Sequence, residues 1–391
     1  MERMRSLSLL LFASLASATA ASSPPASSPF KLVVRAEEPV IASGHLRRVP
    51  VVKSYPLNAQ AVARSRKIGR LSSNLGPGLD HALHAINARR AKPAVFRSEG
   101  GHWVARQVTG WRVDEAATRA ALLKAIRAGK HQAEAVVKFT SPQRSVKLLA
   151  ERGVLYHLAG GQSSYRGSPP FRVRNVLVGA DKLDNTFLKP GGELNFNQQV
   201  GEISAATGFV KGFVIADGTL EKEDGGGICQ VSTTLFRMAY AAGLPITERH
   251  AHSHRVEYYD PVGLEATVYA PAKNLRFKND TAHHLFIQAS WDEGAATLRF
   301  DLFGGKPDRT VKVSKPAVGN FKPPAQPSFS PDPRVRAGGR RLLDVPVQGM
   351  TSVIQRTVRL DGGKVRRDTL KSTYAPWGAV YGVAPSDARL R

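Results

Sequence analysis

Hydrophobic and polar positions in the first 110 residues form short runs that predict strands. The β-branched runs at 32–34 and 49–52 flank polar turn residues, so these two segments are expected to pair as a hairpin or as edge strands. Val95-Phe96 and Trp103-Val104 are two further short apolar segments, and the turn residues 99–101 separate them. This part of the chain is therefore expected to supply paired strands.

Two segments further along carry the signals of capped helices. Asp114 is placed to cap a helix that runs to Ala128, with leucine and isoleucine on one face and glycine at the stop position. Ser141-Pro142 is typical of an N-cap followed by proline at the first helical position, and Gly153 is expected to end that helix. A Gly/Ser-rich loop is expected to follow from 160 to 168.

The C-terminal part returns to the period of a strand. Valine and isoleucine alternate with polar residues over 353–360, and the turn residues 361–363 follow, which predicts a β-hairpin. Residues 315–339, just before it, are rich in proline and favour an extended linker.

Taken together, these elements predict an α+β, multidomain protein. It should comprise a small α+β N-terminal domain, a central domain with a mixed sheet and a few helices, and a C-terminal β extension. The predicted boundaries are a signal peptide at 1–20, a flexible leader at 21–30, the small domain at 31–140, the central domain at 141–305, a Pro-rich linker at 306–340 and a β module at 341–391.

The first 20 residues have the pattern of a secretory signal. Arg3 and Arg5 precede a largely apolar run at 7–15, and Ala18-Thr19-Ala20 forms an A-x-A cleavage site. An uncleaved membrane anchor is the alternative, but the run is short for a span, which needs roughly 20 apolar residues. We therefore expect an exported protein of the cell envelope, in the periplasm or cell wall, with no transmembrane segment apart from the signal.

Composition narrows the class of partner. The formal net charge is +25, and the basic residues are spread along the whole chain instead of forming one arm. Nucleic-acid binding would rest on this charge alone. Together with an export signal, the charge favours anionic envelope polymers as partners and no specific nucleic acid. A solvated basic surface without a specific partner is the other interpretation.

The single cysteine, Cys229, is the main candidate for chemistry, since one cysteine cannot form an internal disulfide. Three glycines precede it and allow close approach by a substrate. Residues 230–242 have apolar positions at helical spacing, which places Cys229 at or just before a helix N-terminus. That position favours a thiolate and an oxyanion. The alternative is a buried cysteine that only packs.

The region around Cys229 resembles the VanW family. Three pieces carry the resemblance, in this order: Lys189-Pro190-Gly191-Gly192-Glu193-Leu194-Asn195-Phe196-Asn197; Gly225-Gly226-Gly227-Ile228-Cys229-Gln230-Val231-Ser232-Thr233-Thr234-Leu235-Phe236; and Ile246-Thr247-Glu248-Arg249 with His252-Ser253, Tyr259-Asp260-Pro261 and Gly263-Leu264-Glu265-Ala266-Thr267-Val268. The family usually has aspartate where this chain has Glu265, and a Phe-Ser pair where it has Leu194-Asn195. The resemblance covers 141–305.

The N-terminal domain at 31–140 shows a second resemblance. Phe96, the Gly100-Gly101 turn and Gly110-Trp111-Arg112-Val113-Asp114 entering a helix are similar to the peptidoglycan-binding domain that often precedes VanW and L,D-transpeptidase domains. A small spacer domain with no ligand of its own is the alternative.

The VanW resemblance also implies a chemistry. Some members of this glycopeptide-resistance-associated family resemble L,D-transpeptidases that use the cysteine of this motif. The implied function is a cysteine-dependent, L,D-transpeptidase-like enzyme that acts on tetrapeptide stems of peptidoglycan through a Cys229 thioester. The alternative is a non-catalytic peptidoglycan-binding or scaffolding protein with a structural cysteine.

Roles for individual residues follow from the motif order and from the needs of a cysteine nucleophile. His252 is the expected base and Glu265 the expected orienting group, with Asp260 as the alternative. Arg249 is expected to bind a stem-peptide carboxylate. The remaining substrate-binding candidates are Gly226, Gly227, Gln230, Thr233 and Ser253.

A metal site is the competing interpretation of the histidines. In the run 250–254, alternate residues are histidines, and His283-His284 or Glu265 would have to add a ligand. Only His252 falls on the family motif, so we expect no metal and no other cofactor.

Overall fold

The structure is a computed structural model that describes residues 29–216 and 219–390. The predicted signal peptide and all but the last two residues of the predicted leader lie outside the described residues. Helices make up 24% of the chain and strands 40%, in several separate sheets, which confirms the α+β class. Among the described residues, no helix has both the length and the apolar composition needed to cross a bilayer.

The chain forms two compact units. Unit 1 comprises the residues up to Ala36, Val51–Arg90 and Trp111–Thr140; unit 2 comprises Glu37–Pro50, Ala91–Gly110 and Ser141–Arg391. The predicted border after residue 140 coincides with a border between the units. The stretches 37–50 and 91–110, which we assigned to the N-terminal domain, group with unit 2 instead.

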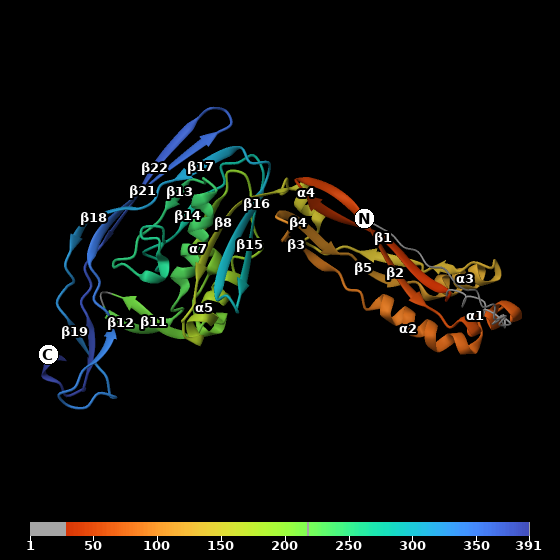
Figure 1. Ribbon diagram of the computed structural model, residues 1–391, viewed down its shortest axis with the longest axis horizontal. Coiled ribbons are helices and arrows are strands. Elements are labelled where there is room, and N and C mark those ends of the chain that lie inside the picture. The colour runs from red at the N-terminus through yellow and green to blue at the C-terminus, as the bar shows by residue number, and fades with distance from the viewer. Residues whose placement is uncertain (1–28, 217–218, 391) are drawn as a thin grey trace, which may run out of the picture. The chain divides into compact units, whose positions relative to one another are not determined.

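Helices and short strands build unit 1 (Figure 1). Its elements are α1 (Ala59–Ile68), α2 (Gly76–Asn87), α3 (Glu115–Arg127), β5 (Gly110–Val113), β6 (Gln132–Glu134), β7 (Val137–Thr140) and parts of β1 (Lys31–Ala42) and β2 (His45–Pro56). Asp114 caps α3 by accepting a 2.9 Å hydrogen bond from the Ala117 N–H, so that helix is confirmed. Helices α1 and α2 were not predicted.

The core of unit 1 explains how these helices are held. Leu32 and Val34 of β1 are buried together with Leu79 and Leu83 of α2 and with Leu122 of α3. The first part of β1 pairs in parallel with β6, and β1 also pairs with β2 as the sequence predicts.

Unit 2 holds the region that resembles VanW. Its first elements are β3 (Lys92–Glu99), β4 (His102–Val108), α4 (Val146–Glu151), β8 (Tyr156–Ser164), α5 (Pro170–Asp181), β9 (Thr186–Leu188), β10 (Glu193–Asn195), α6 (Phe196–Val200), β11 (Lys211–Ala216), β12 (Thr219–Asp224), α7 (Ile228–Ala241), β13 (Ile246–Glu248), β14 (Arg276–Lys278), β15 (Leu285–Asp292) and β16 (Thr297–Gly304). Strands β3 and β4 form the predicted hairpin.

An antiparallel sheet in the order β8-β16-β15-β9 carries the core of this region. Helix α7 packs on β8 and β16 (Figure 1). Phe286 and Phe303 are fully buried with Phe96, whose ring stacks on Phe303 at 3.9 Å. This aromatic packing explains why residues 91–110 belong to unit 2.

Two local predictions are wrong, one within strand β8 and one in the segment before it. Residues 160–164 continue strand β8 instead of starting a loop, because they pair with β16. Gly161 lets α7 approach the strand: a Cβ there would lie 2.3 Å from the Thr234 carbonyl oxygen. The helix expected at Ser141-Pro142 begins at Val146, with Ser145 as its N-cap. Arg144, just before the cap, is held by hydrogen bonds with Ala94.

The C-terminal residues add two further sheets. Their strands are β17 (Arg309–Val313), β18 (Ala317–Lys322), β19 (Ser328–Pro331), β20 (Arg341–Asp344), β21 (Gly349–Leu360), β22 (Val365–Tyr374) and β23 (Val380–Val383). The predicted hairpin is confirmed as β21 and β22. The expected linker at 306–340 contains strands, because β17 and β18 both pair with β21 and β19 pairs with β23.

The buried side chain of Arg356 fastens this hairpin to α7. It donates to the carbonyl oxygens of Tyr240 and Leu244 at 3.0 and 3.1 Å and pairs with Asp368 at 2.7 Å. The C-terminal strands are therefore packed into unit 2.

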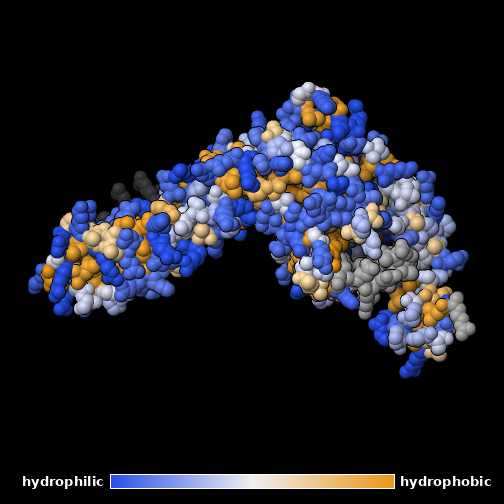
Figure 2. Space-filling view, turned by 180° about the vertical axis from the view of Figure 1, so that it is seen from behind, coloured by the Kyte–Doolittle hydropathy of each residue, from blue (hydrophilic) through white to orange (hydrophobic). Residues whose placement is uncertain are grey.

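Hydrophilic residues cover most of the face shown in Figure 2, with apolar residues in small separate groups.

Candidate functional site around Cys229

Cys229 is the second residue of helix α7, as the sequence predicts. Gly227 is the N-cap and has φ 114°, a backbone conformation that suits glycine. The Ile228 N–H donates to the Gly225 carbonyl oxygen at 3.0 Å, and the Gln230 N–H donates to that of Gly227 at 2.9 Å. The glycine turn thus begins the helix and uses two of its first three N–H groups.

The glycines before Cys229 make room for protein atoms. A Cβ on Gly227 would lie 2.9 Å from the Arg172 Cγ, and the Gly226 carbonyl oxygen accepts a hydrogen bond from the buried Asn175 at 3.0 Å. Both partners belong to α5. The close approach that we expected for a substrate is occupied at these positions by a helix.

Cys229 is a partly exposed residue packed against the core, and its sulfur touches two polar groups. Its Sγ lies 3.4 Å from the Thr267 Oγ1 and 3.5 Å from the Val268 carbonyl oxygen. Neither residue was among the predicted site residues. Their signal in the sequence was their place two and three positions after Glu265, within the third motif piece.

Tyr259 and His252 form a stacked pair, and Tyr259 is the member of the pair that is influenced by Cys229. Their rings stack with centroids 4.7 Å apart and 20° between the planes. Burial, and next the charge of Cys229, raise the pKa of Tyr259 above its ordinary value, so the phenol lies within electrostatic range of the sulfur. Within the described residues, no hydrogen bond joins Cys229 and His252.

The environment of His252 keeps its imidazole neutral. The residue is partly exposed, but its Nδ1 is buried and has no hydrogen-bond partner in the described part of the chain. Burial, followed by the positive charges of Arg249 and Lys273, lowers the pKa of His252 to about 3. A neutral imidazole can accept a proton, but the lowered pKa makes His252 a weak base, and its unpartnered nitrogen is buried.

Glu265 has partners other than the imidazole. It is 3% exposed, and its carboxylate accepts from the Tyr374 hydroxyl at 2.8 and 2.9 Å and from Arg249 at 3.1 Å. The Gly263 N–H donates to it at 3.3 Å. These contacts do not give it the orienting role that we expected at the His252 Nδ1. Asp260, the alternative, pairs with Arg255 at 2.8 Å.

Arg249 is also used inside the fold. Its guanidinium donates to the Glu265 carbonyl oxygen at 2.6 Å, to the Gly263 carbonyl oxygen at 3.0 Å and to the Ser372 hydroxyl at 2.8 Å. The side chain is only 5% exposed. In this arrangement Arg249 neutralises Glu265, so the carboxylate that it binds is internal to the protein.

Of the predicted substrate-binding residues with uncharged polar side chains, two are buried and one is exposed. Gln230 is fully buried and bonds to Arg172 and Ser163, and the fully buried Thr233 exchanges hydrogen bonds with the main chain of Ala266. Ser253 is exposed. Of these three, only Ser253 presents its side chain to solvent.

The three alternating histidines go to three different environments. His250 pairs with Glu248 at 3.0 Å, and His254 bonds to the Ala375 carbonyl oxygen at 3.0 Å. His252 stacks on Tyr259. Within the described residues, no group of three or more His, Cys, Asp or Glu side chains is placed to hold a metal ion.

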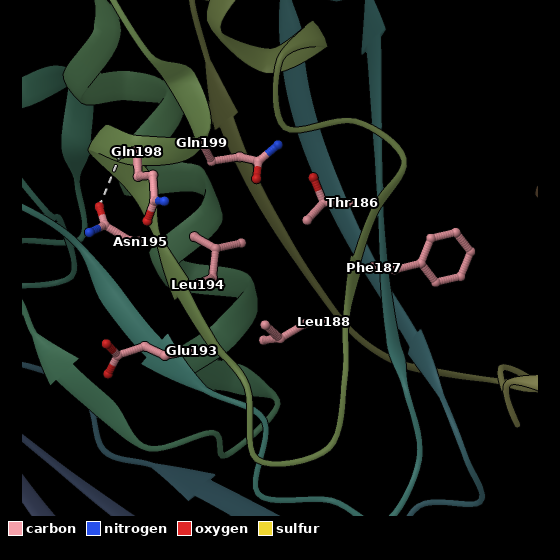
Figure 3. A pocket seen from close by; sticks show the side chains of 8 residues that line it. All are labelled: Thr186, Phe187, Leu188, Glu193, Leu194, Asn195, Gln198 and Gln199. Atoms are coloured by element: carbon pink, nitrogen blue, oxygen red, sulfur yellow. Dashed lines mark hydrogen bonds between the residues drawn. The ribbon is translucent and has the colours of Figure 1, made fainter.

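Two surface cavities of about 380 Å³ lie elsewhere on unit 2. Thr186, Phe187, Leu188, Glu193, Leu194, Asn195, Gln198 and Gln199 line the first, which Figure 3 shows, and Leu177, Val178, Asp181, Lys182, Thr207 and Trp291 line the second. In Figure 3, Leu188 and Leu194 point into the space between β9 and β10, while Phe187 points away from it. Neither set of lining residues includes Cys229 or His252.

Among the comparisons with known proteins, one family model covers the region that contains Cys229 and His252. Residues 171–301 match the family model described as VanW like protein. The chain is 32% identical over 157 residues to Uncharacterized protein YoaR of Bacillus subtilis (strain 168), which covers 39% of this chain and 52% of that protein. It is 30% identical over 115 residues to Vancomycin B-type resistance protein VanW of Enterococcus faecalis (strain ATCC 700802 / V583), which covers 28% of this chain and 42% of that protein.

The chain thus spans about half the length of the curated relatives that it matches. The VanW resemblance seen in the sequence is confirmed over 171–301. The peptidoglycan-binding role of residues 31–140 stays a prediction.

Proposed function

Residues 171–301 form a VanW-like domain, and from this premise we propose that the protein acts on peptidoglycan as a cysteine-dependent, L,D-transpeptidase-like enzyme of the cell envelope. The substrate would be a tetrapeptide stem, and Cys229 would be the nucleophile. The signal-like N-terminus and the formal net charge of +25 support an anionic envelope as the place of action.

One observation carries the proposal. The only cysteine of the chain is partly exposed in the first turn of α7, where backbone N–H groups favour negative charge. The neutral imidazole of His252 stacks on the ring of Tyr259, and the phenol of Tyr259 lies within electrostatic range of Cys229. This supplies a nucleophile, a proton acceptor and a positively polarised helix end in one region.

The proposed reaction has two acyl transfers. His252 accepts the thiol proton, and the Cys229 sulfur attacks the carbonyl carbon of the third stem residue. The C–N bond to D-alanine breaks, its nitrogen takes up the proton, and a thioester remains. An amine of a second stem then attacks the thioester and regenerates the thiol, whereas water as acceptor would make the protein a carboxypeptidase.

In this proposal, Arg249 and Glu265 act as framework residues. Their mutual pairing and their low exposure leave them no free group for a substrate. Thr267 takes their place beside the nucleophile, because its hydroxyl is 3.4 Å from the sulfur and either atom can be the donor.

A non-catalytic wall-binding protein is the second candidate, and a specific observation favours it. Gln230, Thr233, Arg249 and Glu265 all make internal hydrogen bonds, and neither cavity described above is lined by Cys229. In that case the cysteine is a packing residue. The two candidates predict different reactivity for the thiol and different products from muropeptides.

The decisive experiment incubates purified muropeptides with the wild type and with Cys229→Ala and Cys229→Ser, followed by mass spectrometry. We expect the wild type alone to release D-alanine and to form 3–3 linked dimers. His252→Gln should also lose activity, whereas His250→Gln, which changes a histidine paired with Glu248, should keep it.

A wild type that releases no D-alanine, and whose Cys229 resists iodoacetamide, would refute the enzyme. Binding of that same protein to purified peptidoglycan sacculi would then establish the scaffold. Circular dichroism of every variant provides the folding control.

A further inference from the structure

The two segments beside Cys229 are joined to each other. Residues 265–268 bring Thr267 and Val268 to the sulfur, and residues 249–254 carry His252. The Thr267 N–H donates to the His250 carbonyl oxygen at 2.9 Å. The ion pair between Arg249 and Glu265 links the same two segments a second time, so a shift of one segment displaces the other.

Strand β22 of the C-terminal hairpin holds both segments. The Tyr374 hydroxyl is within 2.8 and 2.9 Å of the two carboxylate oxygens of Glu265. The Ser372 hydroxyl, two residues earlier on the same face of the strand, accepts from Arg249 at 2.8 Å. One strand therefore contacts each half of the buried ion pair.

The chain just after β22 contacts the neighbours of His252 directly. The Ala375 N–H donates to the Ser253 carbonyl oxygen at 2.7 Å, and the Ala375 carbonyl oxygen bonds to the His254 Nδ1 at 3.0 Å. The ring of Trp377 meets that of His254 edge to face at 4.6 Å. The loop that carries His252 is thus held by hydrogen bonds and a ring contact to residues 375–377.

Burial makes these contacts difficult to replace. Glu265 is 3% exposed, Tyr374 2% and Ser372 1%. Water has little access to the pair, so a carboxylate that loses the Tyr374 hydroxyl is left short of a hydrogen bond inside the protein. The least costly response is a movement of Glu265, which directly precedes the segment at the sulfur.

We infer that Tyr374 is a positioning residue for the Cys229 site, and that the C-terminal β hairpin sets the position of the segments that form this site. The catalytic consequence rests on the proposed function. The effect on the surroundings of the sulfur does not rest on it, because the rate of alkylation of Cys229, whether fast or slow, is measured without any enzymatic activity.

The test compares the full-length wild type with Tyr374→Phe, which removes one hydroxyl and keeps the ring. The first measurement is the rate constant for alkylation of Cys229 by iodoacetamide, from about pH 6 to about pH 10. The second is kcat and KM for D-alanine release. Tyr381→Phe is the matched control, since Tyr381 lies on β23 of the same C-terminal region and stacks with Phe329 away from the ion pair.

For Tyr374→Phe we expect a shifted alkylation profile. We also expect a kcat lower by about tenfold, the ratio that corresponds to about 1.4 kcal/mol, at a nearly unchanged KM. Tyr381→Phe should match the wild type in both measurements. A Tyr374→Phe protein that melts at a lower temperature but keeps the wild-type alkylation profile and kcat would overturn the inference, because its role would be structural only.

The experiment distinguishes a failure of the proposed function from a failure of the positioning role of Tyr374. If the wild type has no activity, the proposed function fails, and the alkylation profile alone decides whether Tyr374 positions the site. If Tyr374→Phe does not fold, Ser372→Ala takes its place, since it removes the hydrogen bond to Arg249 from the same strand. An unchanged profile in a folded Ser372→Ala would then refute the positioning role.

Discussion

Replacing Gly161 with alanine tests how closely α7, and with it Cys229, must approach the central sheet. A Cβ at this position would lie 2.3 Å from the Thr234 carbonyl oxygen and 2.5 Å from the Met238 nitrogen, whereas ordinary contact begins at 3.4 Å. Both atoms belong to the backbone of α7, so no side chain can rotate away. The helix or the strand must move by about 1 Å.

The size of the effect follows from this displacement. Overpacking of a well-packed core costs about 1–3 kcal/mol, and a clash between backbone atoms belongs at the upper end of that range. For a unit of this size, each kcal/mol lowers the melting temperature by roughly 2–4 °C. We therefore expect Gly161→Ala to melt roughly 6–12 °C below the wild type.

The assay is differential scanning calorimetry of the full-length protein, with alkylation of Cys229 as a second readout. Gly319→Ala is the matched control, because Gly319 also lies in a strand of unit 2 and a Cβ there meets nothing within 4 Å. Equal melting temperatures for Gly161→Ala, Gly319→Ala and the wild type would refute the claim that this glycine sets the distance between helix and sheet.

Three further predictions address the hairpin, the imidazole and a helix cap. Arg356→Met removes the donor to two carbonyl oxygens at the end of α7 and should lower the free energy of unfolding by about 3–5 kcal/mol in urea denaturation. Arg359→Met, at an exposed position, should change it little. Similar losses for both variants would contradict the role of Arg356. His252 is neutral in the folded protein because its pKa is about 3, against 6.5 ordinarily. Below about pH 6.5 the unfolded chain therefore binds a proton that the folded protein does not bind. The free energy of unfolding should fall as pH is lowered from about 6.5 to about 3, by up to about 1.4 kcal/mol per pH unit. His252→Phe, which keeps the stacking ring, should flatten this dependence, and an NMR titration of His252 near pH 6.5 would argue against the buried nitrogen. Asp114→Ala should destabilise unit 1 by about 1 kcal/mol through loss of the cap on α3, and an unchanged melting transition would show that the hydrogen bond to Ala117 contributes nothing.

Elements with local signals were predictable. Asp114 caps its helix through its own side chain, the alternation over 353–360 forms a strand, and the glycines before Cys229 begin a helix. These features depend on residues a few positions apart, so the sequence contains all their partners. The motif order was equally readable, and the match to VanW over 171–301 rests on it.

Most of the remainder depended on partners distant in sequence. The Gly160-Gly161 pair looks like a loop in isolation and is a strand because it pairs with β16, while α7 packs closely against Gly161. The Pro-rich stretch at 306–340 contains strands because β17 and β18 pair one after the other along the edge of β21 that β22 leaves free.

The sequence by itself determined that one cysteine would stand at a helix start and that histidine, arginine and glutamate of the same motif would lie in its region. Only the tertiary structure decided their roles. Glu265 and Arg249 are charged groups removed from water, and a buried charge must find its counter-charge wherever the fold provides it. In the fold these two residues pair with each other, and Glu265 also binds Tyr374, which lies more than 100 residues further along the chain. The Cys229 sulfur therefore contacts Thr267 instead, and the His252 imidazole stacks on Tyr259.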